Sequence, residues 1–384
     1  MQLTADERDA LDGKGGEALA SAYRILAAIG EATDAEKLVP IEWAHVSGVN
    51  YNTIGDAGLQ FLENFAASAR TAVRTTINPM GYDRSRPIGI SASFMEKQER
   101  IVSAYEKMGV QASFTCTPYE VFKIPARGTA VSFAESNAAV FANSIQGLRT
   151  NKESALSALA SAVTGKAPLS DLRSRKAEKP AAKIRVDHEF STELDFGLLG
   201  YFAGKVVRDS SVALAGIRVP STIEAKALSG GMGTSGSCGM FSIDENSAGE
   251  TISFGKKESG DILSELNTAE DGDAIVLGSP QFGMGELDLL SRLVDGKKFD
   301  RRCMIFCSRA IHAQAQKAGL TGKLERSGAE FMCDSCACLT PYVTRDQFDS
   351  VIANSVKGAY YLNNSNKVNV ALKDIKTIAK EYTE

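Results

Sequence analysis

The feature that most constrains the fold of this chain is a repeating sequence pattern. A short apolar run typical of a strand is followed by a polar or cysteine-bearing turn and then by a helix. In the C-terminal half this order predicts strands over residues 273–277, 302–306 and 329–333, and helices over residues 283–293 and 309–318. In the N-terminal half it predicts a strand over residues 110–115. Strands that alternate with helices are typical of parallel sheets covered by helices, so the sequence predicts an α/β fold.

Cysteines stand at or just beyond the ends of three of these strands. They are Cys116, Cys307 and Cys336. Because ligands of open α/β sheets gather beyond the carboxyl ends of the strands, these thiols can converge on one crevice. Three thiolates suit an iron–sulfur cluster that leaves one iron open to substrate. The local spacing also fits a structural zinc site, formed by Cys303-x3-Cys307 with Cys333-x2-Cys336-x-Cys338, so both alternatives stay open.

Composition excludes several classes of protein. The 384 residues include 43 Lys and Arg against 47 Asp and Glu, and the formal net charge of −4 argues against a nucleic-acid partner. No apolar run reaches the roughly 20 residues of a membrane-spanning helix, and the charged N-terminal segment is unlike a signal peptide. Seven cysteines, an odd number, argue against a disulfide scaffold. We therefore expect a cytoplasmic protein with no membrane partner.

The length suggests several lobes rather than one core. We expect an N-terminal α/β lobe over residues 1–165 that contains Cys116, a Gly-, Pro- and Lys-rich linker over residues 166–183, and C-terminal α/β lobes over residues 184–384 that contain Cys307 and Cys336. Within the last region, the glycine-rich run Ser229–Gly239 lacks the ending of a phosphate-binding loop, and we interpret it as a flexible turn or an interface loop.

Two further segments carry polar groups at positions that suit a site. Residues 133–154 mix helical periodicity with polar side chains, so that Glu135, Ser136, Asn137 and Asn143 either face a site or cap the helix. His45 lies in a polar loop over residues 45–58, although a lone histidine is more often structural than catalytic.

Seven strings in the sequence also carry a family resemblance. They occur in the order HVSGVN, TTINPMGYD, TCTPYE, AESNAAVFANSIQGLRTN, ELDFGLLGYFAG, FCSRA and NSVKGAYYL. Together they resemble the large, catalytic subunit of the aconitase X family, over nearly the whole chain. This resemblance implies an aconitase-like body of several α/β/α lobes without the swivelling domain, with a cluster in a crevice at the carboxyl ends of strands.

The resemblance also implies an activity and a cofactor. The Asn-Pro and Thr-Cys-Thr-Pro-Tyr strings are most similar to the archaeal branch, which dehydrates (R)-5-phosphomevalonate to trans-anhydromevalonate 5-phosphate in a modified mevalonate pathway. The bacterial branch, which dehydrates cis-3-hydroxy-L-proline, is the alternative, and a zinc-stabilised structural subunit is a second one. The implied cofactor is a [4Fe–4S] cluster. Its matching thiols are Cys116, Cys307 and Cys336, although the sequence departs from its relatives in the additional thiols of Cys333 and Cys338.

The remaining site residues follow from the same resemblance. The matching substrate-binding positions are Gly48, Val49, Asn50, Asn78 and Pro79, and the matching active-site positions are Glu135, Ser136 and Lys357, the last of which also suits an anionic substrate. No residue of this chain is a convincing base. The family assigns that role to a serine of a small swivelling domain, so the resemblance implies a heteromer with a small partner subunit and a small phosphorylated hydroxy acid as substrate.

Overall fold

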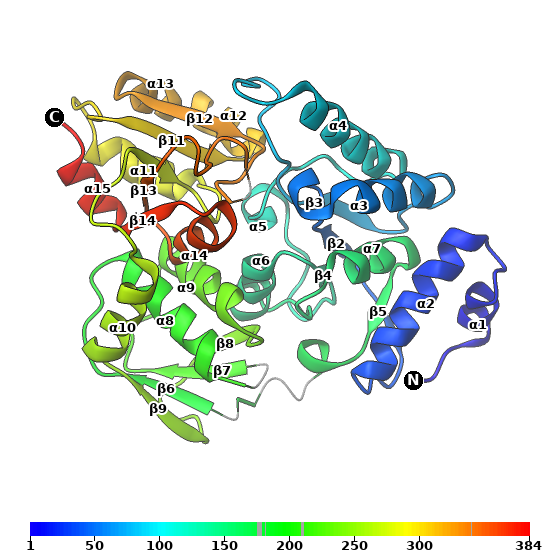
Figure 1. Ribbon diagram of the computed structural model, residues 1–384. Coiled ribbons are helices and arrows are strands. Elements are labelled where there is room, and N and C mark those ends of the chain that lie inside the picture. The colour runs from blue at the N-terminus through cyan, green and yellow to red at the C-terminus, as the bar shows by residue number, and fades with distance from the viewer. Residues whose placement is uncertain (175–178, 181, 209–210, 339) are drawn as a thin grey trace.

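The computed structural model describes residues 1–174, 179–180, 182–208, 211–338 and 340–384. In this described part the chain forms three α/β lobes in sequence order (Figure 1). The N-terminal lobe contains the parallel sheet β3-β2-β4 and the antiparallel pair β1-β5. The middle lobe contains the parallel sheet β8-β7-β6-β9, and the C-terminal lobe contains the parallel sheet β12-β11-β10-β13-β14. The prediction of an α/β fold with parallel sheets is confirmed.

The N-terminal lobe has these bounds: α1 Ala5–Leu11, α2 Glu17–Ala32, β1 Leu38–Pro40, β2 Trp43–Val46, α3 Tyr51–Ala66, β3 Arg74–Ile77, α4 Ala92–Lys107, α5 Pro118–Val121, β4 Ser132–Phe133, α6 Ser136–Phe141, α7 Ala155–Thr164 and β5 Lys166–Pro168. The middle lobe has β6 Ala182–Val186, α8 Glu193–Val206, β7 Ser211–Ala215, α9 Thr222–Ser235, β8 Met240–Ile243, β9 Glu250–Phe254 and α10 Lys256–Leu266.

The C-terminal lobe has β10 Ala274–Leu277, α11 Met284–Leu293, β11 Arg302–Cys307, α12 Arg309–Lys317, α13 Leu320–Arg326, β12 Ala329–Cys333, β13 Ser350–Ala353, α14 Val356–Tyr361, β14 Asn369–Leu372 and α15 Ile375–Glu381. The three strands predicted here from the sequence occur within one residue of their expected bounds. One apolar core joins the lobes, since a single cluster of buried side chains includes Leu26, Leu214 and Val370.

The strand predicted over residues 110–115 differs from the structure. The chain does run beside β3, where the Gln111 amide donates to Thr75 O and the Thr115 amide donates to Ile77 O, at 2.8 and 3.1 Å. Only Gln111 forms a bridge, however, because Phe114 has a φ of +40° and turns the backbone out of the extended conformation. Cys116 therefore follows a bend rather than a regular strand.

The glycine-rich run near residue 230 is not the expected turn or loop, and most of it is helical. It forms the end of α9, which packs directly on α8. A Cβ on Gly231 would lie 2.1 Å from the carbonyl oxygen of Gly197, and a Cβ on Gly200 would lie 2.1 Å from that of Leu228. The glycines allow the two helix backbones to touch, so their purpose is close packing rather than flexibility.

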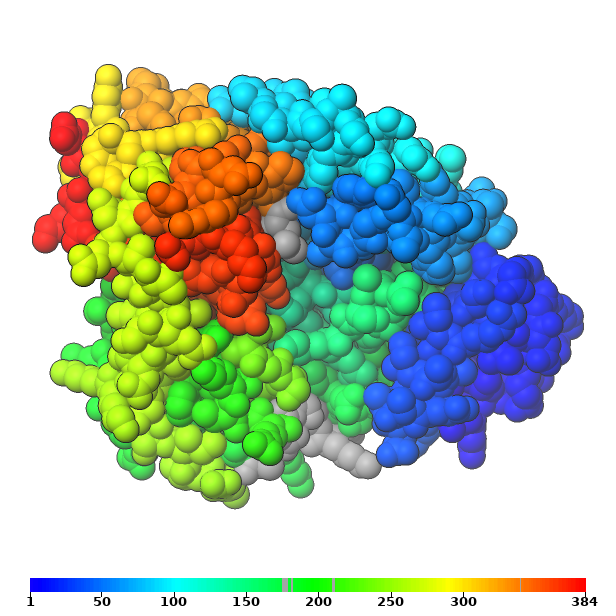
Figure 2. Space-filling view, viewed as in Figure 1, coloured from blue at the N-terminus to red at the C-terminus, as the bar shows by residue number. Residues whose placement is uncertain are grey.

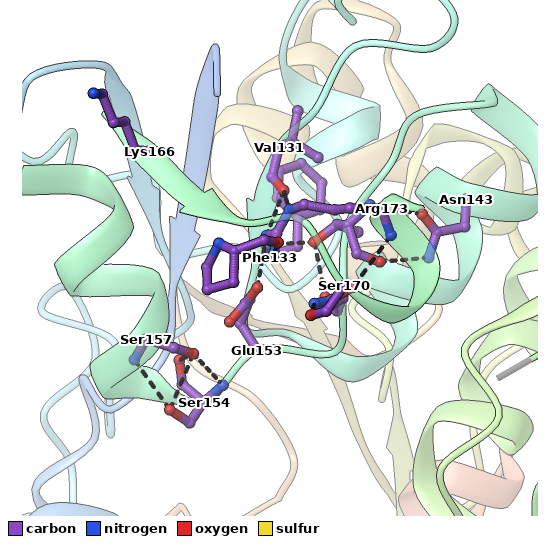
Figure 3. A network of polar contacts seen from close by, with 12 residues as sticks. Val131, Phe133, Asn143, Glu153, Ser154, Ser157, Lys166, Ser170 and Arg173 are labelled. Carbon is purple, nitrogen blue, oxygen red and sulfur yellow. Dashed lines mark hydrogen bonds and ion pairs between the residues drawn. The ribbon is translucent and has the colours of Figure 1, made fainter. Parts of the chain in front are cut away.

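The expected linker over residues 166–183 falls partly on residues 175–178 and 181, which lie outside the described part. Its described beginning is built into the N-terminal lobe: β5 pairs with β1, and the buried Arg173 follows (Figure 3). The Arg173 guanidinium donates to the carbonyl oxygen of Val131 at 2.8 Å and to the carboxylate of Glu153 at 2.6 Å. A buried cation with these partners fixes the segment against β4 and its flanking loops.

No described helix has both the length and the apolar character needed to cross a bilayer.

A buried charge cluster connects all three lobes. Lys226 of α9 lies 2.9 Å from the carboxylate of Glu120 on α5 and 2.8 Å from that of Glu286 on α11. Burial alone lowers the pKa of Lys226, but the two carboxylates outweigh burial and raise it. Lys226 is therefore a permanent cation that allows two carboxylates to be buried side by side.

We expect Lys226→Met to destabilise the protein by about 3–5 kcal/mol, because it leaves two buried carboxylates without their shared cation. The control is Lys205→Met, which removes an exposed ion pair with Glu265 and should cost at most about 1 kcal/mol. Chemical denaturation of both variants measures the difference. Equal midpoints for the two variants would contradict the structural role of Lys226.

Candidate active site

The predicted site residues, except Cys307, line one pocket of about 490 Å³ between the N-terminal and C-terminal lobes. Figure 2 shows the two sides that face each other across it, with residues of the N-terminal lobe in blue and residues of the C-terminal lobe in orange and red. The lining consists of Ser47, Gly48, Val49, Asn50, Thr53, Ile54, Asn78, Pro79, Cys116, Ala134, Glu135, Ser136, Ala155, Cys336, Cys338, Lys357 and Tyr361.

Sheet geometry explains why distant segments meet here. The segments that begin at Ser47, Asn78 and Ala134 directly follow β2, β3 and β4, whose strands are parallel. Lys357 follows β13 of the C-terminal sheet in the same way. The pocket therefore lies where the carboxyl ends of two parallel sheets approach each other, the usual place for a site in an α/β fold.

An ion pair between the N-terminal and C-terminal lobes lines the pocket. The Lys357 ammonium donates to Glu135 Oε1 and, at 2.5 Å, to Asn137 Oδ1. All three side chains are buried. Burial alone lowers the pKa of Lys357, but the negative charge of Glu135 outweighs burial and raises it. Lys357 is thus a fixed cation at the pocket wall.

A chain of hydrogen bonds with defined directions leads from the N-terminal sheet to Glu135. Asn78 Nδ2 donates to Glu135 Oε2 at 2.7 Å, which leaves Asn78 Oδ1 to accept from His45 Nε2 at 2.8 Å. Because burial keeps the His45 ring neutral, its Nδ1 accepts from the Thr76 hydroxyl at 2.8 Å, and Thr76 Oγ1 accepts from Trp43 Nε1, also at 2.8 Å. This order fixes the tautomer of His45 and the orientation of the Asn78 amide.

The loop with Gly48, Val49 and Asn50 is held rigidly at the pocket rim. Gly48 has a φ of +80°, which favours glycine, and a Cβ there would lie 3.1 Å from Ala155 Cβ. Asn50 caps α3 by accepting from the Asn52 amide at 2.9 Å. Gln98 on α4 donates to Val49 O at 2.8 Å and accepts from the Tyr51 amide at 3.2 Å. The loop is therefore preorganised before any ligand arrives.

Three thiols form one wall of the pocket. Cys336 Sγ lies 3.7 Å from Ser279 Oγ, and Cys338 Sγ lies 3.0 Å from the same hydroxyl group. The Cys116 thiol accepts from the backbone amide of Gln281 at 3.1 Å. The neighbouring thiol of Cys116, followed by that of Cys338, lowers the pKa of Cys336. Burial raises the pKa of Cys116.

Cys307 lies elsewhere, contrary to the expectation that it joins Cys116 and Cys336. On β11 the side chains alternate, and Cys303, Ile305 and Cys307 point into a second core cluster with residues of α11, α12 and α13. Cys333, the register partner of Cys307 on β12, belongs to the same cluster, and its thiol raises the pKa of Cys307. Cys307 is absent from the described lining of the pocket. The strand end was located correctly, but the side chain points to the opposite face.

The zinc alternative from the sequence finds no support in this geometry. Of its five thiols, Cys303, Cys307 and Cys333 lie in the second core cluster, whereas Cys336 and Cys338 lie at the pocket. Among the described residues, no group of three or more His, Cys, Asp or Glu side chains surrounds the position of a single metal ion. The three pocket thiols nevertheless fit an iron–sulfur group, because such a cluster takes one thiolate on each of several irons.

Comparison with known proteins agrees with this architecture. The family models for the first, second and third domains of aconitase X match residues 1–174, 180–262 and 272–384. The chain belongs to the aconitase X family. The crystal structure of the holo-form of aconitase X from Thermococcus kodakaraensis superposes with a TM-score of 0.91, at 33% identity, and covers 100% of both chains. The aconitase-like fold expected from the sequence is confirmed.

Two groups of aconitase X relatives carry activity names. The phosphomevalonate dehydratase large subunit of Methanocaldococcus jannaschii is 34% identical and matches over 99% of this chain and 100% of its own length. The cis-3-hydroxy-L-proline dehydratase of Hypocrea jecorina is 30% identical and matches over 94% of this chain, but over only 65% of its own length. Since both groups are dehydratases, the chain belongs to a family of hydro-lyases.

Four residues at or beside the pocket were not assigned a role there from the sequence. The sequence singled out His45 and Asn137 but gave them no function, and it missed Ser279 and Tyr361. The only signal available was position in the chain: Asn137 lies in the first turn of α6 and Ser279 just beyond β10, whereas His45 lies within β2 and Tyr361 at the end of α14. That position does not say which side chain points into the pocket, so sequence alone could not select them.

We expect His45 to stay neutral over the physiological pH range, because burial lowers its pKa from the ordinary 6.5 to about 4. As the folded pKa lies below the unfolded one, the contribution of His45 to stability is complete above pH 6.5 and is lost as the pH falls towards 4. With three histidines in the chain, NMR titration can follow each ring. His45→Gln assigns its signal, and a midpoint near 6.5 for that signal would contradict the hydrogen-bond order above.

Proposed function

We propose that this chain is the large subunit of a phosphomevalonate dehydratase, which removes water from (R)-5-phosphomevalonate to give trans-anhydromevalonate 5-phosphate. The observation that carries the proposal is the match over the whole length of relatives named phosphomevalonate dehydratase large subunit. The hydroxyproline dehydratases match over 65% and 66% of their own length. Dehydration of cis-3-hydroxy-L-proline is therefore the second candidate.

The pocket contains groups that suit this chemistry. Elimination of water from an alcohol β to a carboxylate builds negative charge on that carboxylate, and a preorganised cation stabilises such charge. Lys357 is positioned for this, because Glu135 and Asn137 fix its ammonium at the pocket wall. Asn78 and Ser136 are the neighbouring hydrogen-bonding groups, and Gly48, Val49, Asn50 and Pro79 form the rim that would hold the rest of the substrate.

We propose a [4Fe–4S] cluster as cofactor, with Cys116 and Cys336 among its ligands. Both thiols line the pocket that contains Lys357 and Asn78. When bound, such a cluster supplies an iron with an open position, which acts as a Lewis acid towards the departing hydroxyl group. The contribution of the protein is to place the thiols and the substrate-binding groups around one small cavity.

The base is proposed to come from a small partner subunit, in line with the name "large subunit" of the relatives. Glu135 is the carboxylate of the described lining, and both of its oxygen atoms already accept hydrogen bonds, Oε1 from Lys357 and Oε2 from Asn78. Lys357 is the cation of that lining and is already paired. A substrate with a carboxylate and a phosphate needs further positive charge, which the partner would also supply.

The substrate assignment is tested with the chain co-purified with its small subunit, without oxygen, after reconstitution with iron and sulfide. We expect dehydration of (R)-5-phosphomevalonate and none of cis-3-hydroxy-L-proline, followed by mass spectrometry of the loss of water. A loaded complex that acts only on the hydroxyproline would replace the first candidate with the second. Omission of the small subunit should abolish turnover, because the base is then missing.

We expect Lys357→Met to lower kcat/KM by about 100-fold or more, since it removes the fixed cation of the pocket. The exposed Lys297→Met is the matched control and should keep full activity. Because the first change leaves Glu135 buried without its partner, it should also lower the thermal midpoint. The double variant Lys357→Met/Glu135→Gln should recover stability but not activity. Recovery of activity in the double variant would show that Lys357 is only structural.

A further inference from the structure

The pocket contains one thiol that neither the family resemblance nor the relatives assign to any role. Cys338 lines the same cavity as Cys116 and Cys336. The Cys338 and Cys336 thiols share one neighbour, the Ser279 hydroxyl group, which lies within 3.7 Å of both sulfur atoms. The three thiols lie on the loop after β12 and on the bend before α5, two segments that are distant in sequence.

The surroundings of Cys338 differ from those of a buried structural cysteine. Ser279, on the loop after β10, places its hydroxyl 3.0 Å from Cys338 Sγ and 3.7 Å from Cys336 Sγ. Cys338 is also partly exposed, as is Cys336, whereas Cys303, Cys307 and Cys333 are enclosed by the apolar side chains of the second core cluster. Cys338 is thus accessible from the cavity and already has a hydrogen-bond partner for its sulfur.

Cys307 cannot take this place without rearrangement of the core. Its side chain faces α12 on the other side of β11, and it shares a contact with Cys333 across the strand pair. To reach the pocket wall, β11 would have to shift its register by one residue, which would turn every apolar side chain of the strand to the wrong face. The parallel pairing of β11 with both β10 and β12 opposes such a shift.

We propose that Cys338, together with Cys116 and Cys336, supplies the third thiolate of the iron–sulfur cluster, and that Ser279 is the hydroxyl group that hydrogen-bonds to this ligand. The inference rests on the proposed cofactor and names its ligands. Each thiol binds iron as a thiolate and releases one proton, with no change in the oxidation state of sulfur. A cluster held by these three thiols would share one cavity with Lys357, Asn78 and the rim formed by Gly48, Val49 and Asn50.

The test uses the full chain with its small subunit, reconstituted with iron and sulfide under anaerobic conditions. Iron and acid-labile sulfide per chain and the electron paramagnetic resonance spectrum are measured for the parent, Cys338→Ser and Cys307→Ser. We expect Cys338→Ser to lose the cluster and Cys307→Ser to keep it. The thermal midpoint of each variant without iron separates loss of a ligand from loss of the fold.

A rescue variant makes the assignment sharper. Because Ser279 Oγ lies 3.0 Å from Cys338 Sγ, Ser279→Cys in the Cys338→Ser background returns a thiol to the same wall and should restore iron and sulfide binding. A Cys338→Ser protein that retains the parent content of iron and sulfide overturns the ligand assignment alone. A parent complex that takes up neither iron nor sulfide overturns the proposed cofactor, and the ligand assignment with it.

Discussion

The buried ion pair between Lys357 and Glu135 is the interaction on which the site depends. The lysine belongs to the C-terminal lobe and the carboxylate to the N-terminal lobe, and neither charge is stable in this environment without the other. The pair is therefore satisfied only when the two lobes are packed as observed. It also explains why the pocket lies at their boundary: each lobe contributes half of a charge pair, and the cavity forms where the halves meet.

Each of the two charges lies at the start of a short helix. Glu135 directly precedes α6 and Lys357 lies in the first turn of α14, and each of these helices ends in a wider, π-helical turn, over residues 142–146 and 362–366. A wider turn inserts one residue into the helical repeat and is frequent at functional sites. The two lobes thus use the same local device, a strand that leads into a short helix, to aim a charged side chain at the other lobe.

The sequence predicts the order of elements in the C-terminal lobe well, because each strand there is a short apolar run followed by an amphipathic helix. Prediction fails where the result depends on the face of an element or on contacts between distant segments. Cys307 ends a correctly predicted strand, yet the alternation of side chains directs it into the core. The glycine-rich composition near residue 230 is typical of a loop. Gly231 nevertheless lies in a helix, where the absence of a side chain allows α8 to approach closely. Asn78, Glu135 and Lys357 were identified as site residues through the family resemblance. Their spacing along the sequence alone could not show that they lie close together.

The direction of the hydrogen bonds limits what each pocket residue can do. Because Glu135 accepts from Asn78 and from Lys357, and the His45 ring is neutral, each donor in the hydrogen-bond series that begins at Trp43 points towards Glu135. The negative charge of Glu135 in turn raises the pKa of Lys357 despite burial, so Lys357 stays charged. Lys357 is then fixed in charge and unsuited to moving a proton. The ion pair and its hydrogen-bond partners therefore form a static electrostatic frame, which holds a permanent cation at the pocket wall.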